Sequence, residues 1–219
     1  LGDVYKRQEN GRLKEGIPKQ NFSDASNLRP GDIRYRDLNG DGEITAVDET
    51  SIGGTSVPEI VYGFGATVRY KSIDLGIFFQ GTGNTDRILG GETWLPGSSL
   101  GAGNIYSNID DRWTPENPNQ NVFWPRMGDK AVANNERPST WWLRDMSFLR
   151  LKNLELGYTL PPVWTNKIGV RNCRLFLRGT NLLTFSKFKL WDPELETNDG
   201  LRYPQMKSIS IGLSINFNN

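Results

Sequence analysis

Apolar and polar residues alternate strictly along residues 208–217 of this chain. Ile209, Ile211, Leu213, Ile215 and Phe217 have one parity, and serine, glycine and asparagine have the other. Successive side chains of a β-strand point to opposite faces, so the segment predicts a strand with one apolar and one small, polar face. A transmembrane barrel strand shows this pattern, with its apolar side toward lipid. A soluble β-sandwich strand shows it too, with its apolar side in the core.

The same reasoning predicts five antiparallel strands, at residues 59–70, 73–83, 144–158, 172–184 and 205–217. Lys71-Ser72 forms a tight turn between the first two. The third strand changes parity, because Leu149 and Leu151 are out of phase with Leu154 and Leu156. A β-bulge near Asn153 would return all four side chains to one face. Residues 163–169, after Pro161-Pro162, are expected to form a short helical turn.

The predicted connections alternate in length. Residues 9–58, 83–143 and 187–204 are long and rich in polar residues, glycine and proline, whereas 71–72 and 159–171 are short. Outer-membrane barrels have short turns at one end and long loops at the other, and a sandwich has no reason to sort its loops this way. The pattern favours an all-β antiparallel meander that forms the C-terminal part of a large transmembrane β-barrel, open in this fragment. Tyr62 and Tyr70 lie near strand ends, where barrels carry interfacial aromatic residues.

Composition excludes several other classes. The chain has 219 residues, a net charge of +1 and 36% hydrophobic residues, so nothing indicates nucleic-acid binding. It has no histidine, which excludes Ser-His-Asp and Cys-His catalysis and histidine metal sites. Cys173 is the single cysteine, so no internal disulfide forms, and we expect it to be inert. No pair of acidic residues has a spacing that predicts acid–base catalysis, so we do not expect an enzyme.

Residues 37–48 carry the one sharp chemical motif. Asp37, Asn39, Asp41, Glu43 and Asp48 match ligand positions 1, 3, 5, 7 and 12 of an EF-hand loop, with Gly42 at the obligatory turn. Glu43 would contribute its backbone oxygen, and Asp48 replaces the usual bidentate glutamate. The spacing predicts a weak Ca²⁺ site. The alternative is a Gly/Asp turn that is held by its own side-chain hydrogen bonds.

Several stretches together resemble the SusC/RagA family of TonB-linked (TonB-dependent) outer-membrane transporters. They are Pro30–Gly42, Ile52-Gly53, Phe148–Pro161, Arg178–Phe185 and the terminal strand. The resemblance implies a barrel of about 22 strands around an N-terminal plug. It also implies location in a Bacteroidota-type outer membrane, energy supplied through the TonB complex, and import of glycan fragments (oligosaccharides) or peptides together with a SusD-like lipoprotein. The plug and most strands would lie outside this chain.

We expect the following organisation along the chain. Residues 1–8 look like translated adapter sequence and not native protein. Residues 9–58 form an extracellular loop with the acidic motif, and residues 59–219 form C-terminal barrel strands with extracellular loops at 83–143 and 187–204. The five apolar residues of the terminal strand are expected to contact outer-membrane lipid and to be recognised by the barrel-assembly machinery. The other hypothesis, from a different class, is a secreted calcium-dependent carbohydrate-binding β-sandwich.

Two sets of polar and aromatic residues are weaker candidates. Trp94, Trp113, Trp124 and Trp191 are candidates for contact with substrate or a partner, although packing within loops and anchoring at the membrane interface are the more ordinary roles. Arg69, Arg174 and Arg178 are expected to line the inner wall of the barrel, where salt bridges would balance their charge.

Overall fold

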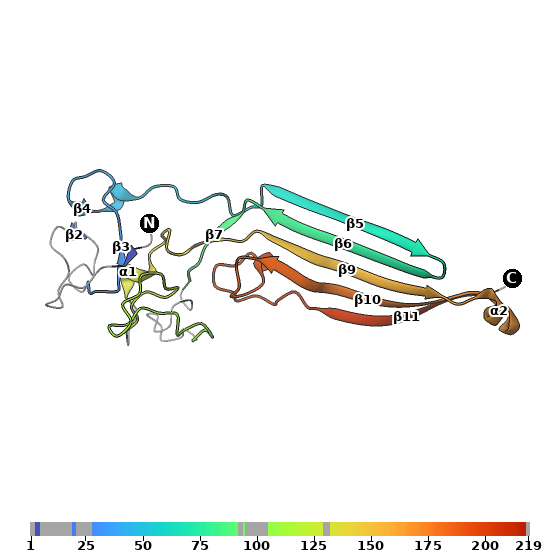
Figure 1. Cartoon of the computed structure of the whole chain (residues 1–219). Helices are drawn as coiled ribbons and strands as arrows, with labels where there is room; N and C mark the ends of the chain where they lie inside the picture. The colour runs from blue at the N-terminus through green and yellow to red at the C-terminus, as the bar shows by residue number, and fades with distance from the viewer. Residues whose placement is uncertain are drawn as a thin grey trace. The chain divides into compact units, whose positions relative to one another are not determined.

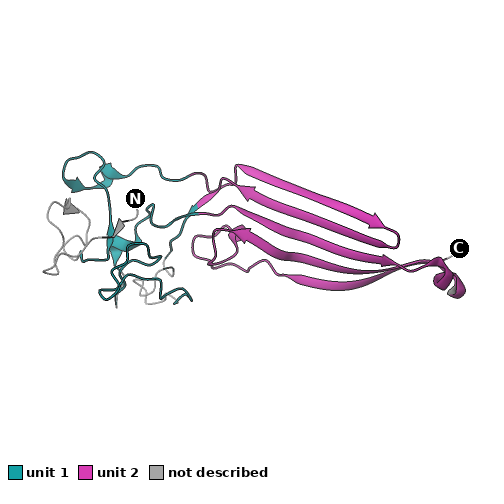
Figure 2. Ribbon diagram, viewed as in Figure 1, with its two compact units in different colours: residues 1–53, 87–144 teal, residues 54–86, 145–219 magenta. Residues whose placement is uncertain are grey.

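The structure, a computed structural model, describes residues 3–4, 19–20, 28–91, 94, 105–128 and 132–217, with the backbone alone at 3–4, 19–20 and 168. The predicted adapter residues 1–8 therefore lie outside the described residues, except for the backbone of 3–4. Contacts divide the chain into two units (Figure 2): residues 1–53 with 87–144, here unit 1, and residues 54–86 with 145–219, here unit 2. Within the described residues, no helix has the length and apolar character needed to cross a membrane.

The elements follow one another along the chain as β1 (Asp3–Val4), β2 (Lys19–Gln20), β3 (Ile33–Arg34), β4 (Glu43–Ile44), the 3-10 helix η2 (Ala46–Asp48), β5 (Ile60–Tyr70), β6 (Ile73–Gly83), β7 (Asp86–Ile88), α1 (Ala133–Glu136), β8 (Leu143–Asp145), β9 (Phe148–Thr159), α2 (Pro162–Thr165), the 3-10 helix η3 (Asn166–Ile168), β10 (Val170–Ser186), the 3-10 helix η4 (Pro193–Leu195) and β11 (Ser208–Phe217).

Unit 2 is built on one antiparallel sheet with the strand order β5-β6-β9-β10-β11 (Figure 1). The spatial order follows the chain order, so the sheet is a meander, and the prediction of five antiparallel strands is confirmed. The strand ends differ from the predicted ones by a few residues. β9 begins at Phe148 and not at residue 144, because Leu143–Asp145 forms the separate short strand β8.

The pairing places the apolar residues of all five strands on one face. Directly opposed residues of an antiparallel pair share a face. Leu213 of β11 is opposite Leu175 of β10, which is opposite Tyr158 of β9, which is opposite Ile73 of β6. Ile73 is in turn opposite Tyr70 of β5. Each row across the sheet therefore continues the apolar face from one strand to the next.

The expected β-bulge in β9 is present. Asn153 is opposite Phe78 of β6, but the next pair joins Leu151 to Phe79, so Lys152 is an extra residue on β9. The extra residue shifts the parity by one. As a result, the leucines before and after the bulge point to the same face of the sheet.

Both short connections lie at one end of the sheet. The backbone N–H of Thr159, at the end of β9, donates to the carbonyl oxygen of Ser72 in the β5–β6 turn at 2.7 Å. The expected helical turn is present as α2 and η3 between β9 and β10. The long connections, which follow β6 and β10, therefore leave from the opposite end, as the lengths of the predicted loops indicated.

Unit 1 is formed by the two long segments that were predicted to be separate loops. The carboxylate of Asp32 accepts hydrogen bonds from the guanidinium of Arg126 at 2.8 Å and from the side-chain amide of Asn135 at 3.0 Å. The Ile33 backbone N–H donates to the side-chain oxygen of Asn135 at 2.8 Å, and the Asn134 amide donates to the Ile33 carbonyl at 2.8 Å. These bonds join residues about 100 positions apart into one buried polar network.

Candidate functional site

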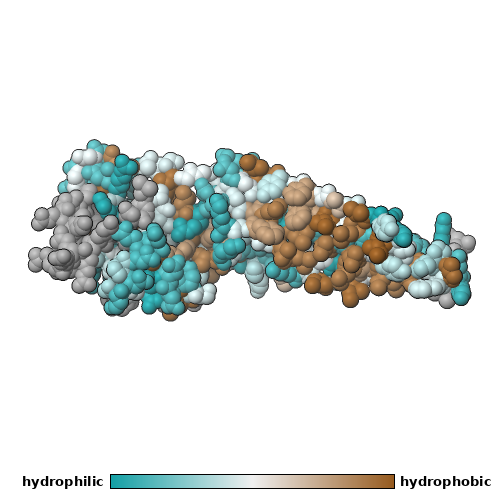
Figure 3. Space-filling view, in the orientation of Figure 1, coloured by the Kyte–Doolittle hydropathy of each residue, from teal (hydrophilic) through white to brown (hydrophobic). Residues whose placement is uncertain are grey.

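The apolar face of the sheet is the largest exposed surface feature of unit 2. Ile209, Ile211 and Leu213 are 72%, 76% and 58% exposed, and large apolar side chains of β5, β6, β9 and β10 on the same face are also exposed. Figure 3 shows hydrophobic residues gathered over the strands. Within the described residues, no strand of another sheet pairs with this one. A sandwich covers such a face with a second sheet, whereas the wall of a membrane barrel leaves it exposed to lipid, and the exposed apolar face fits the second pattern.

The opposite face carries a chain of ion pairs. The guanidinium of Arg174 pairs with the carboxylate of Asp74 and with that of Glu155, the latter at 2.7 Å, and Arg178 pairs with Glu155 at 2.6 Å. Gly157 makes room for this cluster, since a Cβ atom there would lie 2.3 Å from the Arg174 guanidinium. The predicted salt bridges of Arg174 and Arg178 are therefore present.

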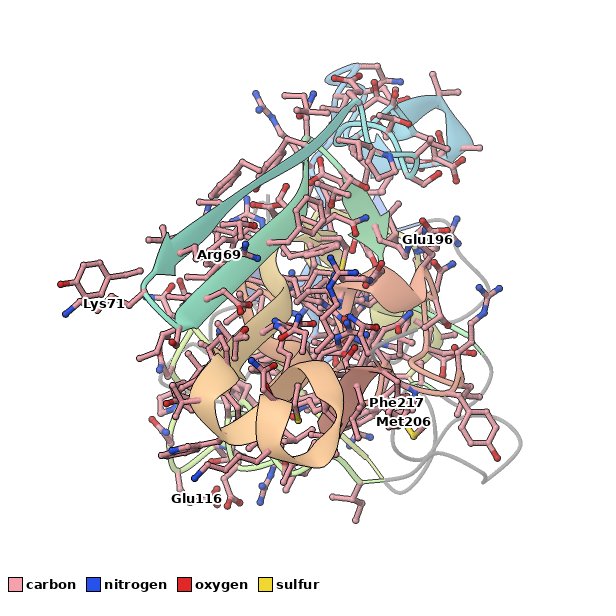
Figure 4. The ribbon with its side chains drawn as sticks, turned by 90° about the vertical axis from the view of Figure 1, so that its right-hand side faces the viewer. Arg69, Lys71, Glu116, Glu196, Met206 and Phe217 are labelled. Atoms are coloured by element: carbon pink, nitrogen blue, oxygen red, sulfur yellow. The ribbon has the colours of Figure 1, made fainter. Side chains whose placement is uncertain are left out.

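Arg69 belongs to the same polar face of β5. Arg69 is directly opposite Asp74 of β6, so the two side chains share a face, whereas Lys71 projects from the β5–β6 turn (Figure 4). The two faces thus differ in chemistry: one is apolar, and the other is mostly small or polar and carries the ion pairs of Arg174 and Arg178 with Asp74 and Glu155.

A buried arginine holds the loop after β10 against the polar face. Arg150 lies between Leu149 and Leu151 and is 1% exposed, yet its guanidinium pairs with the carboxylate of Asp192 and, at 3.2 Å, with that of Glu194. These two acidic residues belong to the Trp-Asp-Pro-Glu segment around η4, and Asp192 also caps η4 by accepting the Glu194 N–H at 3.0 Å. No pattern considered in the sequence predicted this contact between Arg150 and the loop. An arginine in an otherwise leucine-rich stretch was the available signal.

The acidic loop is held by its own hydrogen bonds. The Asp37 carboxylate accepts the N–H groups of Gly40 at 2.6 Å and Gly42 at 2.8 Å. The Asp48 carboxylate accepts those of Leu38 and Thr45, each at 2.8 Å. Gly42 has a φ of +84°, which fits the sharp turn expected there. Backbone hydrogen bonds, those from Thr45 and Leu38 above all, lower the pKa of Asp48.

The donor types of this loop fit calcium better than their arrangement does. Side-chain oxygens of Asp37, Asn39, Asp41 and Asp48 and a backbone oxygen at Glu43 are hard ligands of the kind that Ca²⁺ takes. Among the described residues, however, no group of three or more His, Cys, Asp or Glu side chains lies close enough to hold a metal ion. The amide of Asn39 donates to Asp41 at 2.8 Å, as in a self-supporting turn. Calcium binding here stays a prediction.

The predicted contact tryptophans occupy different positions. Trp94, Trp113 and Trp124 are 1%, 5% and 0% exposed and belong to the core of unit 1. Trp94 and Trp124 pack at a ring-centroid distance of 5.1 Å and both contact Trp142, at 5.9 Å. Such burial supports the packing role for these three. Trp191 is half-buried and packs edge-on against Phe188 in the loop after β10. A contact with substrate or partner stays a prediction.

No protein-family model matches this chain. The TonB-dependent receptor P26 of Formosa agariphila is 35% identical over 212 residues, which cover 89% of this chain and 21% of the receptor. The TonB-dependent receptor SusC of Bacteroides thetaiotaomicron is 25% identical over 202 residues, 87% of this chain and 18% of SusC. The RagAB peptide importer in its open-open state matches with a TM-score of 0.67 and 29% identity, over 85% of this chain and 21% of that one. This chain thus spans about a fifth of the length of these relatives.

Proposed function

Because this chain belongs to the TonB-dependent receptors of the SusC/RagA type, we propose that it forms part of the wall of an outer-membrane β-barrel that imports nutrients. The observation that carries the proposal is the two-faced sheet. Its apolar face continues without interruption across five strands, and its polar face carries balanced ion pairs. A barrel wall needs both faces, one toward lipid and one toward a wet or plugged lumen.

The secreted carbohydrate-binding sandwich is the weaker candidate. It requires a second sheet over the apolar face, and the described residues provide none. The relatives are receptors and an importer, which also fits transport better than catalysis.

In the whole protein, we expect other segments to supply the plug, the contact with the TonB complex and the remaining strands. We propose that a SusD-like lipoprotein pairs with the complete receptor and that the cargo consists of glycan fragments or peptides. The likeness to SusC and RagAB supports this pairing, and the name of the RagAB peptide importer supports peptides as cargo. The loops that form unit 1 would then lie on the extracellular side, because they leave from the long-loop end of the sheet.

Site-directed spin labelling of the full-length receptor in lipid vesicles tests the membrane assignment. Labels are placed at Ile211→Cys and Ser210→Cys, neighbours on opposite faces of β11, in a background with Cys173→Ser. We expect the label at 211 to collide mainly with oxygen dissolved in lipid, and the label at 210 to collide mainly with a water-soluble nickel complex. Two labels that are equally accessible to nickel would refute a lipid-facing apolar side. Co-purification of the tagged receptor with a lipoprotein tests the partner separately.

A further inference from the structure

Unit 1 contains a cavity of about 540 Å³ that no role proposed above uses. It lies between residues 33–52, which include β3, β4 and η2 (Figure 1), and residues 137–141, with Ile88 completing the wall. We call it the arginine pocket, after Arg34, Arg36 and Arg137 in its lining. Its volume is within the range of pockets that bind small ligands, roughly 300–1,000 Å³.

The acidic loop builds one wall of the arginine pocket. Leu38, Ile44, Thr45 and Asp48 are lining residues. The Asp48 carboxylate accepts the N–H groups of Leu38 and Thr45, and the Thr45 hydroxyl accepts the N–H of Val47 at 3.2 Å, so a capping box fixes the turn. The EF-hand-like spacing therefore has a structural use even without a metal, since it sets the shape of this wall.

The other wall is tied to the first by polar contacts. The Tyr35 hydroxyl donates to the Asn134 carbonyl oxygen at 2.5 Å. The guanidinium of Arg137 pairs with the carboxylate of Glu49 at 3.2 Å across the pocket lining. A pocket whose walls are held in this way is largely preformed, which lowers the entropy lost when a ligand binds.

The lining of the arginine pocket holds three arginines, Arg34, Arg36 and Arg137, and two carboxylates, Asp48 and Glu49. Asp48 is occupied by backbone N–H groups, and Glu49 is paired with Arg137. Arg34 and Arg36 are exposed lining residues, and neither side chain has an ion-pair partner within the described part of the chain. Two guanidinium groups in a lining that also holds aliphatic side chains favour a ligand that joins an anion to an apolar group.

We infer that the arginine pocket binds the C-terminal carboxylate of an apolar peptide, with the last side chain in the cavity and the carboxylate on Arg34 and Arg36. Aliphatic residues such as Leu38, Ile44 and Ile52 suit an apolar side chain. Two aromatic residues line the pocket: Trp141 is 6% exposed, and Tyr35 is half-buried with its hydroxyl bonded to Asn134, so neither offers an open ring face with a free polar group to a sugar. The inference rests on the proposed import function and narrows its cargo to peptides with a free carboxyl end.

Calorimetric titration of the full-length receptor in detergent with trileucine, as the free acid and as the C-terminal amide, tests the inference. We expect the acid to bind at least about tenfold more tightly than the amide, since only the acid offers a charged acceptor for the hydrogen bonds of the two guanidinium groups. Arg34→Gln with Arg36→Gln should remove this preference. Arg29→Gln is the matched control, because Arg29 is exposed in the same unit and does not line the pocket.

Several outcomes would overturn the inference. They are equal affinity for acid and amide, no binding of the acid at millimolar concentration, an equal loss in the Arg29 variant, or arginine-dependent binding of a uronate oligosaccharide in place of the peptide. Heat-modifiable migration on gels shows independently whether the barrel is folded. A folded, membrane-inserted receptor that fails this titration rejects the pocket's role and leaves the proposed import function standing.

Discussion

Replacing Leu213 by arginine tests most directly which face of the sheet meets lipid. Strand β11 has ten residues, and Leu213 is the sixth. With a rise of roughly 3.3 Å per residue and a tilt of about 40°, ten residues span about 25 Å, the height of the apolar band of outer-membrane barrels. Leu213 then lies about 1 Å from the midplane on this geometry. An arginine at that depth on the lipid side destabilises a barrel by about 2–4 kcal/mol.

Ser214→Arg is the matched control on the other face. Ser214 is opposite Arg174, whose charge is already balanced by Asp74 and Glu155. A like charge directly across the strand pair destabilises by up to about 1 kcal/mol. The two variants should therefore differ by about 1–4 kcal/mol, or roughly 5- to 900-fold in the folding equilibrium constant.

Urea unfolding of both full-length variants in lipid vesicles measures this difference, and heat-modifiable migration on gels reports the folded fraction. A Leu213 variant as stable as the Ser214 variant, or more stable, would mean that the faces are assigned wrongly. Wild-type stability in both would mean that β11 does not lie in the bilayer at all.

Three further predictions concern the loops. Arg150→Met leaves Asp192 without its buried partner, so we expect a loss of about 3–5 kcal/mol and faster cleavage of the loop after β10 in limited proteolysis; an unchanged cleavage pattern would contradict the role of this contact. The lowered pKa of Asp48 means that its carboxylate stabilises unit 1 fully above its unfolded pKa of about 3.9 and loses this effect as the pH falls through the folded pKa. Asp48→Asn should therefore flatten the acid-unfolding curve followed by tryptophan fluorescence, and coinciding curves would argue against it. Calcium binding by the acidic loop is tested by calorimetry at millimolar calcium with Asp41→Asn as control, and equal heats would exclude a site there.

The five strands were predictable because each carries its own signal. Alternation with a period of two can be read within each strand, and the same residues must stay on the apolar face along the whole strand. Even the bulge at Lys152 was visible, since the leucines around it change parity. The strand ends were less predictable, because the last residues of β10 pair with β9 and not with β11, and no local pattern records that difference.

Unit 1 was not predictable from the same kind of signal. Its polar network joins Asp32 and Ile33 to Arg126, Asn134 and Asn135, which are ordinary loop residues with no periodicity. Only the fold shows that these residues meet. The tryptophans were assigned more easily, because large aromatic residues in a long loop must either pack or bind, and the buried ones pack.

The joining of two distant segments in unit 1 also constrains how the protein can be assembled. Residues 54–86, which separate the two segments, form the β5–β6 hairpin, and its closure brings their adjoining ends together. Shortening the effective loop from about 100 to about 70 residues saves only about 0.3 kcal/mol of closure entropy, so the hairpin matters little for the stability of unit 1. The hairpin matters instead for the order in which the parts of the chain fold. If the hairpin crosses the outer membrane, both segments must reach the far side before their first mutual hydrogen bond can form. Unit 1 would then be the last part of this chain to fold, and its burial of Trp124 would report completed insertion.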